Sequence, residues 1–122
     1  MQSVSQQLIL LEQIADQLRA ITLRSDPDRK KELVVARRTL MEQLSLLQKI
    51  VESESPGGHD SDFMTEFGRQ LAQLRTTTAR FQAEWPAVSL DENPSGYAEA
   101  AKGAGQSLRG FIAWGYQAIG TS

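Results

Sequence analysis

The sequence contains no cysteine and a single histidine, His59, and these shortages exclude several kinds of site. Without cysteine, the chain has no disulfide framework, no thiol nucleophile and no cysteine-based zinc site. A metal site inside a helical bundle needs several inward-facing His or Glu side chains at helical spacing. His59 lies instead among Gly, Ser and acidic residues. We therefore expect no metal and no cofactor.

Long apolar runs and a surplus of basic residues are also absent. No apolar run approaches the ~18 residues that a membrane-spanning helix needs. The first residues lack the basic segment and the cleavage pattern of a secretory signal. A net charge of −2 argues against a general nucleic-acid binder. We expect a cytoplasmic protein with neither a membrane nor a nucleic acid as its partner.

What the sequence does contain is hydrophobic residues at alternating steps of three and four, which predict an all-α fold. The 122 residues, 40% of them hydrophobic, suffice for one domain with its own core. The predicted helices cover approximately residues 3–24, 27–52, 62–85 and 94–119, and a flexible loop covers 53–61. Two of these starts, at Pro27 and Pro94, follow a residue able to cap a helix.

Four long helices with short connections predict an antiparallel up-down-up-down four-helix bundle. The alternative is a long helical hairpin that dimerises. It stays open because the second helix has an additional apolar row, formed by Val35, Thr39, Leu46 and Ile50. In architecture alone, such a bundle resembles small bacterial helical chaperones and regulators, flagellar and secretion chaperones among them. No family motif accompanies this resemblance.

The last helix has two faces of different character. One is a core stripe that begins at Tyr97 and continues through Leu108 and Phe111. The other, called here the small-residue face, consists of Gly96, Ala100, Gly103, Ser107, Gly110 and Trp114. Each Gly within a helix costs about 1 kcal/mol relative to Ala. Either a partner packs closely on this face with Trp114 as an anchor, or the helix is a weak terminal one with a bias toward small residues.

A group of basic residues at the start of the second helix is a further candidate site. Its members pair one heptad apart: Lys30 with Arg37, and Lys31 with Arg38. They form either a patch for an acidic partner or an ordinary solvated face.

No catalytic motif accompanies these features, because every carboxylate falls on a polar face, at a cap or in a loop. We therefore predict a protein that is not an enzyme: a helical protein–protein interaction module, such as a small adaptor, chaperone or regulator. Its partner would be another protein, or a helical segment of one, bound by coiled-coil-like helix packing. The alternatives are a self-assembling helical module, for example a homodimer, and a metal-dependent or acid–base enzyme.

Overall fold

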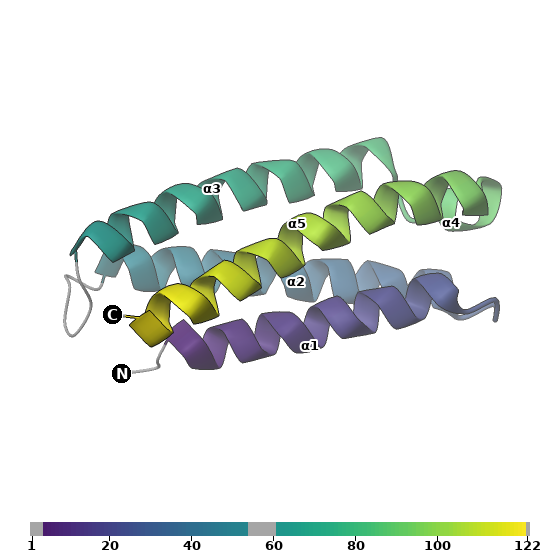
Figure 1. Ribbon diagram of the computed structural model, residues 1–122. Helices are drawn as coiled ribbons and strands as arrows, with labels where there is room; N and C mark the ends of the chain where they lie inside the picture. Colours follow the sequence, from purple (N-terminus) through teal and green to yellow (C-terminus); the bar gives the residue numbers. More distant parts are fainter. Residues whose placement is uncertain (1–3, 54–60, 122) are drawn as a thin grey trace.

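The computed structural model describes residues 4–53 and 61–121 (Figure 1). These residues form the helices α1 (Val4–Leu23), α2 (Arg29–Ser53), α3 (Ser61–Glu84), α4 (Ser89–Glu92) and α5 (Pro94–Thr121). They contain no strand, and the prediction of an all-α bundle is confirmed. Residues 54–60, which include most of the predicted loop and His59, lie outside the described residues.

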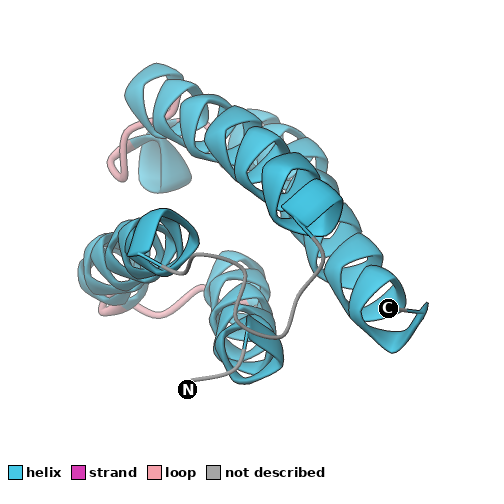
Figure 2. Ribbon diagram, turned by 90° about the vertical axis from the view of Figure 1, so that its left-hand side faces the viewer, coloured by secondary structure: helices cyan, strands magenta, loops and turns pink. Residues whose placement is uncertain are grey.

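The four long helices pack around a common core. Helix α1 contacts α2 and α5, and α3 contacts the same two helices. Successive long helices run in alternate directions, so that α1 begins and α5 ends at the same end of the molecule (Figure 1). Seen from that end, α1 and α2 form one pair, and α3 and α5 cross it at an angle (Figure 2).

The core consists of two clusters of buried side chains. The larger one includes Leu8, Leu44, Phe67 and Leu71, which have no exposed surface. The smaller one lies near the α1–α2 turn and consists of Ile21, Leu33, Ala36, Leu90 and Tyr97. The predicted stripes supply most of these side chains. Leu10 of α1 lies outside both clusters and is 42% exposed.

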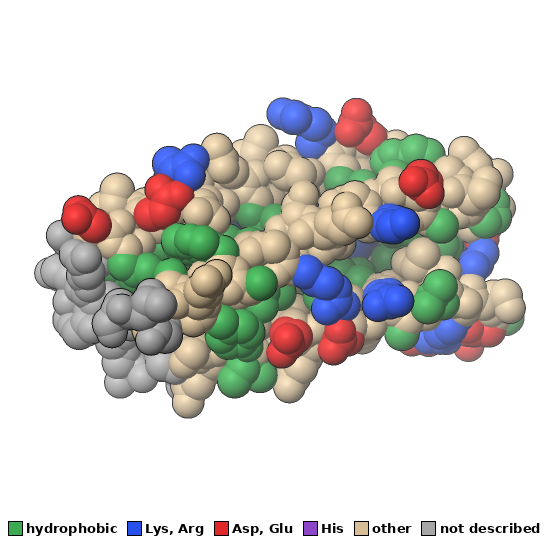
Figure 3. Space-filling model, in the orientation of Figure 1, with side chains coloured by type: hydrophobic (Ala, Val, Ile, Leu, Met, Phe, Trp, Pro, Cys, Tyr) green, Lys and Arg blue, Asp and Glu red, His purple; other side chains and the backbone are tan. Residues whose placement is uncertain are grey.

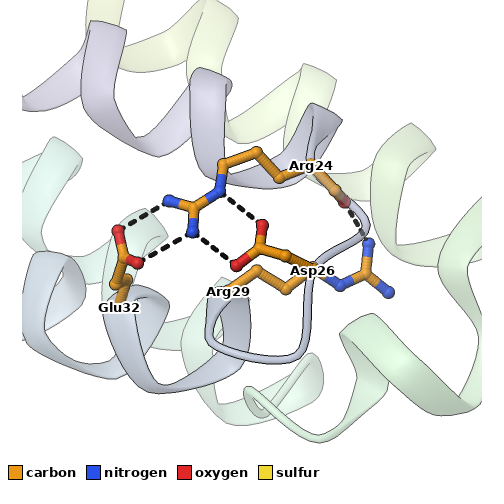
Figure 4. Close-up of polar contacts among 4 residues, drawn as sticks. All are labelled: Arg24, Asp26, Arg29 and Glu32. Carbon is orange, nitrogen blue, oxygen red and sulfur yellow. Dashed lines mark hydrogen bonds and ion pairs between the residues drawn. The ribbon is translucent and has the colours of Figure 1, made fainter.

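The turn between α1 and α2 is held by ion pairs of Arg24 (Figure 4). Its guanidinium donates to Asp26, with Nε 2.7 Å from Oδ1, and to Glu32, with Nη1 2.6 Å from Oε1. These hydrogen bonds lower the pKa of both carboxyls and raise the pKa of Arg24. Helix α2 begins at Arg29 and not at Pro27, because residues 26–28 form the turn, in which the carbonyl oxygen of Asp26 accepts from the Arg29 N–H at 3.2 Å.

The connection between α3 and α5 contains the short helix α4. Leu90 is 1% exposed within the smaller cluster, whereas Val88 is 42% exposed. Arg29 fixes α4 to the α1–α2 turn, since its Nη2 donates to the carbonyl oxygen of Leu90 at 3.0 Å. Asn93 caps α5, because its Oδ1 accepts from the Gly96 N–H at 3.1 Å.

Candidate functional site

The middle of the small-residue face is open. Gly103, Ser107 and Gly110 are exposed, and Ala100 is half-buried. A Cβ atom added at Gly103 or at Gly110 would meet no atom within 4 Å. Packing within the chain therefore does not require glycine at these two positions.

The two ends of the small-residue face are occupied by the chain itself. Gly96 lies against the capping side chain of Asn93, which leaves no room for a Cβ. The Trp114 ring stacks on Phe63 with centroids 5.9 Å apart and also contacts Phe67 and Phe111. Trp114 is thus half-buried against the larger core cluster and is not a free anchor for a partner.

Close approach between helices occurs at a different glycine. A Cβ added at Gly115 would lie 2.8 Å from Cδ1 of Leu8, a buried side chain of α1. Gly115 belongs to the core stripe of α5, and its missing side chain allows α1 and α5 to pack closely.

The structure does not bring the four basic candidates together. Lys30 pairs with Asp91 of α4, with Nζ 3.3 Å from Oδ2. Lys31 and Arg38 are exposed on α2. Arg37 instead crosses toward the end of α3 and the start of α5, where Nη2 lies 3.2 Å from the hydroxyl of Tyr97.

Arg37 is part of the packing at the α3–α5 end of the bundle. Its guanidinium donates to the carbonyl oxygen of Trp85, which is left without an intrahelical partner at the end of α3. The guanidinium carbon also lies 5.4 Å from the ring centre of Phe81 and 5.7 Å from that of Tyr97. These are cation–π distances. Arg37 therefore holds α2, α3 and α5 together.

A pocket of about 470 Å³ opens next to Arg37 among α1, α2, α3 and α5. Its interior is mainly apolar and includes Leu18, Leu40, Phe81 and Leu108. Four of the α5 residues that line the pocket have small side chains, which leaves space on this side of the helix: Ala98, Ala101, Ala104 and Gly105. Between α1 and α5 the molecular surface is hollowed, and hydrophobic side chains are visible inside (Figure 3).

The charged residues that line the pocket share one sign. They are Arg19 of α1, Arg37 of α2, and Lys102 and Arg109 of α5. Among the described residues that line the pocket, none is acidic. Arg109 pairs with Asp16 outside the lining, with 2.8 Å between Nη2 and Oδ1. Lys and Arg side chains lie on both sides of the hollow (Figure 3).

The pocket and the small-residue face are separate surfaces of α5. Gly105 lines the pocket and Ser107 lies at the centre of the small-residue face. Two residues correspond to a rotation of about 200° around an α-helix, so the two positions point in nearly opposite directions. The pocket was not predicted from the sequence, although the spacing of Ala98, Ala101 and Gly105 already placed small residues along one side of the helix.

Metal-ligand clusters and membrane-spanning helices are absent from the described residues. No cluster of three or more His, Asp or Glu that could hold a metal ion occurs within residues 4–53 and 61–121. In the same ranges, no helix has the length and apolarity needed to cross a membrane.

Comparisons of the chain with protein-family models, with curated proteins and with solved structures found no match.

Proposed function

We propose that this chain is a non-enzymatic interaction module of the cytoplasm that binds a helical segment of another protein on the small-residue face of α5. The observation that supports this proposal is the open space above Gly103 and Gly110. Glycine at these positions costs about 1 kcal/mol each in helix stability relative to alanine, and within the described residues the space that a Cβ would take is empty.

A partner helix gives these glycines a role. Small residues let two helix backbones approach closely, which increases the number of packing contacts along the line of approach. The free face extends from Ala100 through Gly103 and Ser107 to Gly110, about 15 Å along the helix axis. That length accommodates about three turns of a docked helix.

Photo-crosslinking in cells tests this proposal, because it captures a partner whose identity is not known. A photoreactive amino acid at Ser107 should give a discrete adduct, whereas the same residue at Thr77, which is exposed on α3, should give none. Gly103→Leu and Gly110→Leu should remove the adduct, because the leucines fill the space that the partner backbone needs. Gly103→Ala should reduce it less.

The outcome also separates the remaining hypotheses. Absence of an adduct at Ser107, or an adduct that both leucine variants retain, would contradict the proposal. An adduct with twice the mass of the chain would contradict the proposal in favour of the alternative, a self-assembling module. Such self-assembly would use the outer side of α2, where Val35 is 53% and Leu46 is 43% exposed.

A further inference from the structure

The pocket next to Arg37 combines an apolar interior with a purely cationic set of charged lining residues. We propose that it binds a small amphipathic anion, specifically an alkyl carboxylate of medium chain length, with the tail among α1, α2, α3 and α5. This inference goes beyond the proposed function, since the pocket and the small-residue face lie on opposite sides of α5.

The size of the pocket argues for a small molecule. Its volume of about 470 Å³ falls in the range of about 300–1,000 Å³ that is typical of small-molecule sites. Leu18, Leu40 and Phe81 offer aliphatic and aromatic contacts from three different helices. An alkyl chain satisfies such a surface, because it needs no hydrogen-bond partner inside.

Charge complementarity argues for an anionic head group. Arg19 and Lys102 approach the pocket from α1 and α5, and both are exposed. Within the part of the chain that the structure describes, neither forms an ion pair. A carboxylate held between these two helices would pair with both cations while its tail is buried. The charge of Arg37 adds to the positive potential, whereas that of Arg109 is paired with Asp16.

The α5 side of the pocket offers a variant that fills it. A Cβ added at Gly105 meets no atom within 4 Å, so Gly105→Leu places its side chain in the open space of the pocket without a clash at the backbone. Ala113→Leu is the matched control, because Ala113 is exposed on the same helix and does not line the pocket.

Calorimetric titration of the purified chain with octanoate, decanoate and dodecanoate tests the inference. Affinity should rise about fourfold with each methylene until the pocket is full. Gly105→Leu should abolish binding, and Ala113→Leu should retain it. The double variant Arg19→Gln, Lys102→Gln should bind decanoate about tenfold more weakly but bind decanol as the native chain does. Arg80→Gln, an exposed α3 position away from the pocket, is the control for charge.

Three results would overturn the inference. One is the absence of heat with all three carboxylates below their micelle concentrations. The second is equal affinity for decanoate, decanol and decylammonium, which would remove the role of the cations. The third is binding that Gly105→Leu leaves intact, which would place the ligand elsewhere. None of these results affects the crosslinking experiment at Ser107, so the two proposals can fail separately.

Discussion

At the residue scale, three glycines of α5 differ in the space that an added side chain would meet. Gly103→Ala and Gly110→Ala should each raise the free energy of unfolding by about 1 kcal/mol, because the added Cβ gains helix propensity and meets open space. Gly115→Val should lower it by about 1–3 kcal/mol, because its side chain overlaps buried Leu8. Urea unfolding measures all three.

The opposite signs expected at Gly103 and Gly110 on the one hand and at Gly115 on the other are the internal control, since the three positions lie on one helix. Stabilisation by Gly115→Val would show that α1 and α5 are not closely packed at Leu8. Destabilisation by Gly103→Ala would show that the middle of the small-residue face is covered within the chain.

Arg24 gives a prediction for the dependence of stability on pH. Its hydrogen bonds lower the folded-state pKa of Asp26 and Glu32 from the ordinary values of 3.8 and 4.5. A lowered folded-state pKa contributes stability that is fully present above the ordinary pKa and is lost as pH falls through the folded-state value. The difference in unfolding free energy between the native chain and Arg24→Gln should therefore shrink as the pH falls below the ordinary pKa values.

Denaturant unfolding of both chains between neutral and acidic pH measures this effect. All three side chains are partly exposed, so salt should weaken it as well. Arg80→Gln changes the same residue type away from the turn. Its difference in unfolding free energy from the native chain should not shrink as the pH falls. A pH-independent difference for Arg24→Gln would contradict the role of these ion pairs.

At the element scale, the docking of α4 depends on one side chain. Leu90 is 1% exposed among Ile21, Leu33 and Tyr97, so Leu90→Ala should lower the unfolding free energy by about 2–5 kcal/mol. Val88→Ala is the matched control, because Val88 is exposed and its truncation should cost well under about 1 kcal/mol. Thermal unfolding compares the two. Equal effects would mean that α4 does not pack against the bundle.

The start of α5 gives a second prediction at this scale. Asn93→Ala removes the acceptor of the Gly96 N–H and should cost about 1 kcal/mol, whereas Asn93→Asp keeps an acceptor and should cost less. Amide hydrogen exchange at Gly96 and Tyr97 should accelerate in the alanine variant alone. Unchanged exchange there would contradict the capping role.

The long helices and most of the core follow from sequence periodicity. A stripe of hydrophobic residues on one side of a helix must face the core of a bundle, as it does for Phe63, Phe67, Leu71 and Leu74. The site was less predictable. In the sequence, Arg37 belongs to a group of basic residues and looks like a surface residue. Its guanidinium points inward because Trp85 and Tyr97, which are distant in the sequence, supply its hydrogen-bond partners. The pocket could not be predicted because four helices together line it. The half-burial of Trp114 likewise depends on another helix, since Phe63 and Phe67 of α3 contact its ring.

At the scale of the whole molecule, the distribution of exposed apolar side chains bears on self-association. The large ones with considerable exposure include Ile9 and Leu10 on α1, and Val34, Val35 and Leu46 on α2. Singly exposed hydrophobic residues are normal on the surface of a monomer. The proposed partner surface, in contrast, consists of small residues with little apolar area of their own. We therefore expect the free chain to be a monomer of 13.5 kDa.

Light scattering after size exclusion, over a range of concentrations, measures this mass directly. A constant monomer mass agrees with a chain whose α2 surface is solvated and whose α5 surface binds a different protein. A mass that rises toward the dimer with concentration, and that Leu46→Glu returns to the monomer value, would assign the outer side of α2 to contacts between copies. Thr77→Glu is the control, because it adds the same charge on the exposed side of α3.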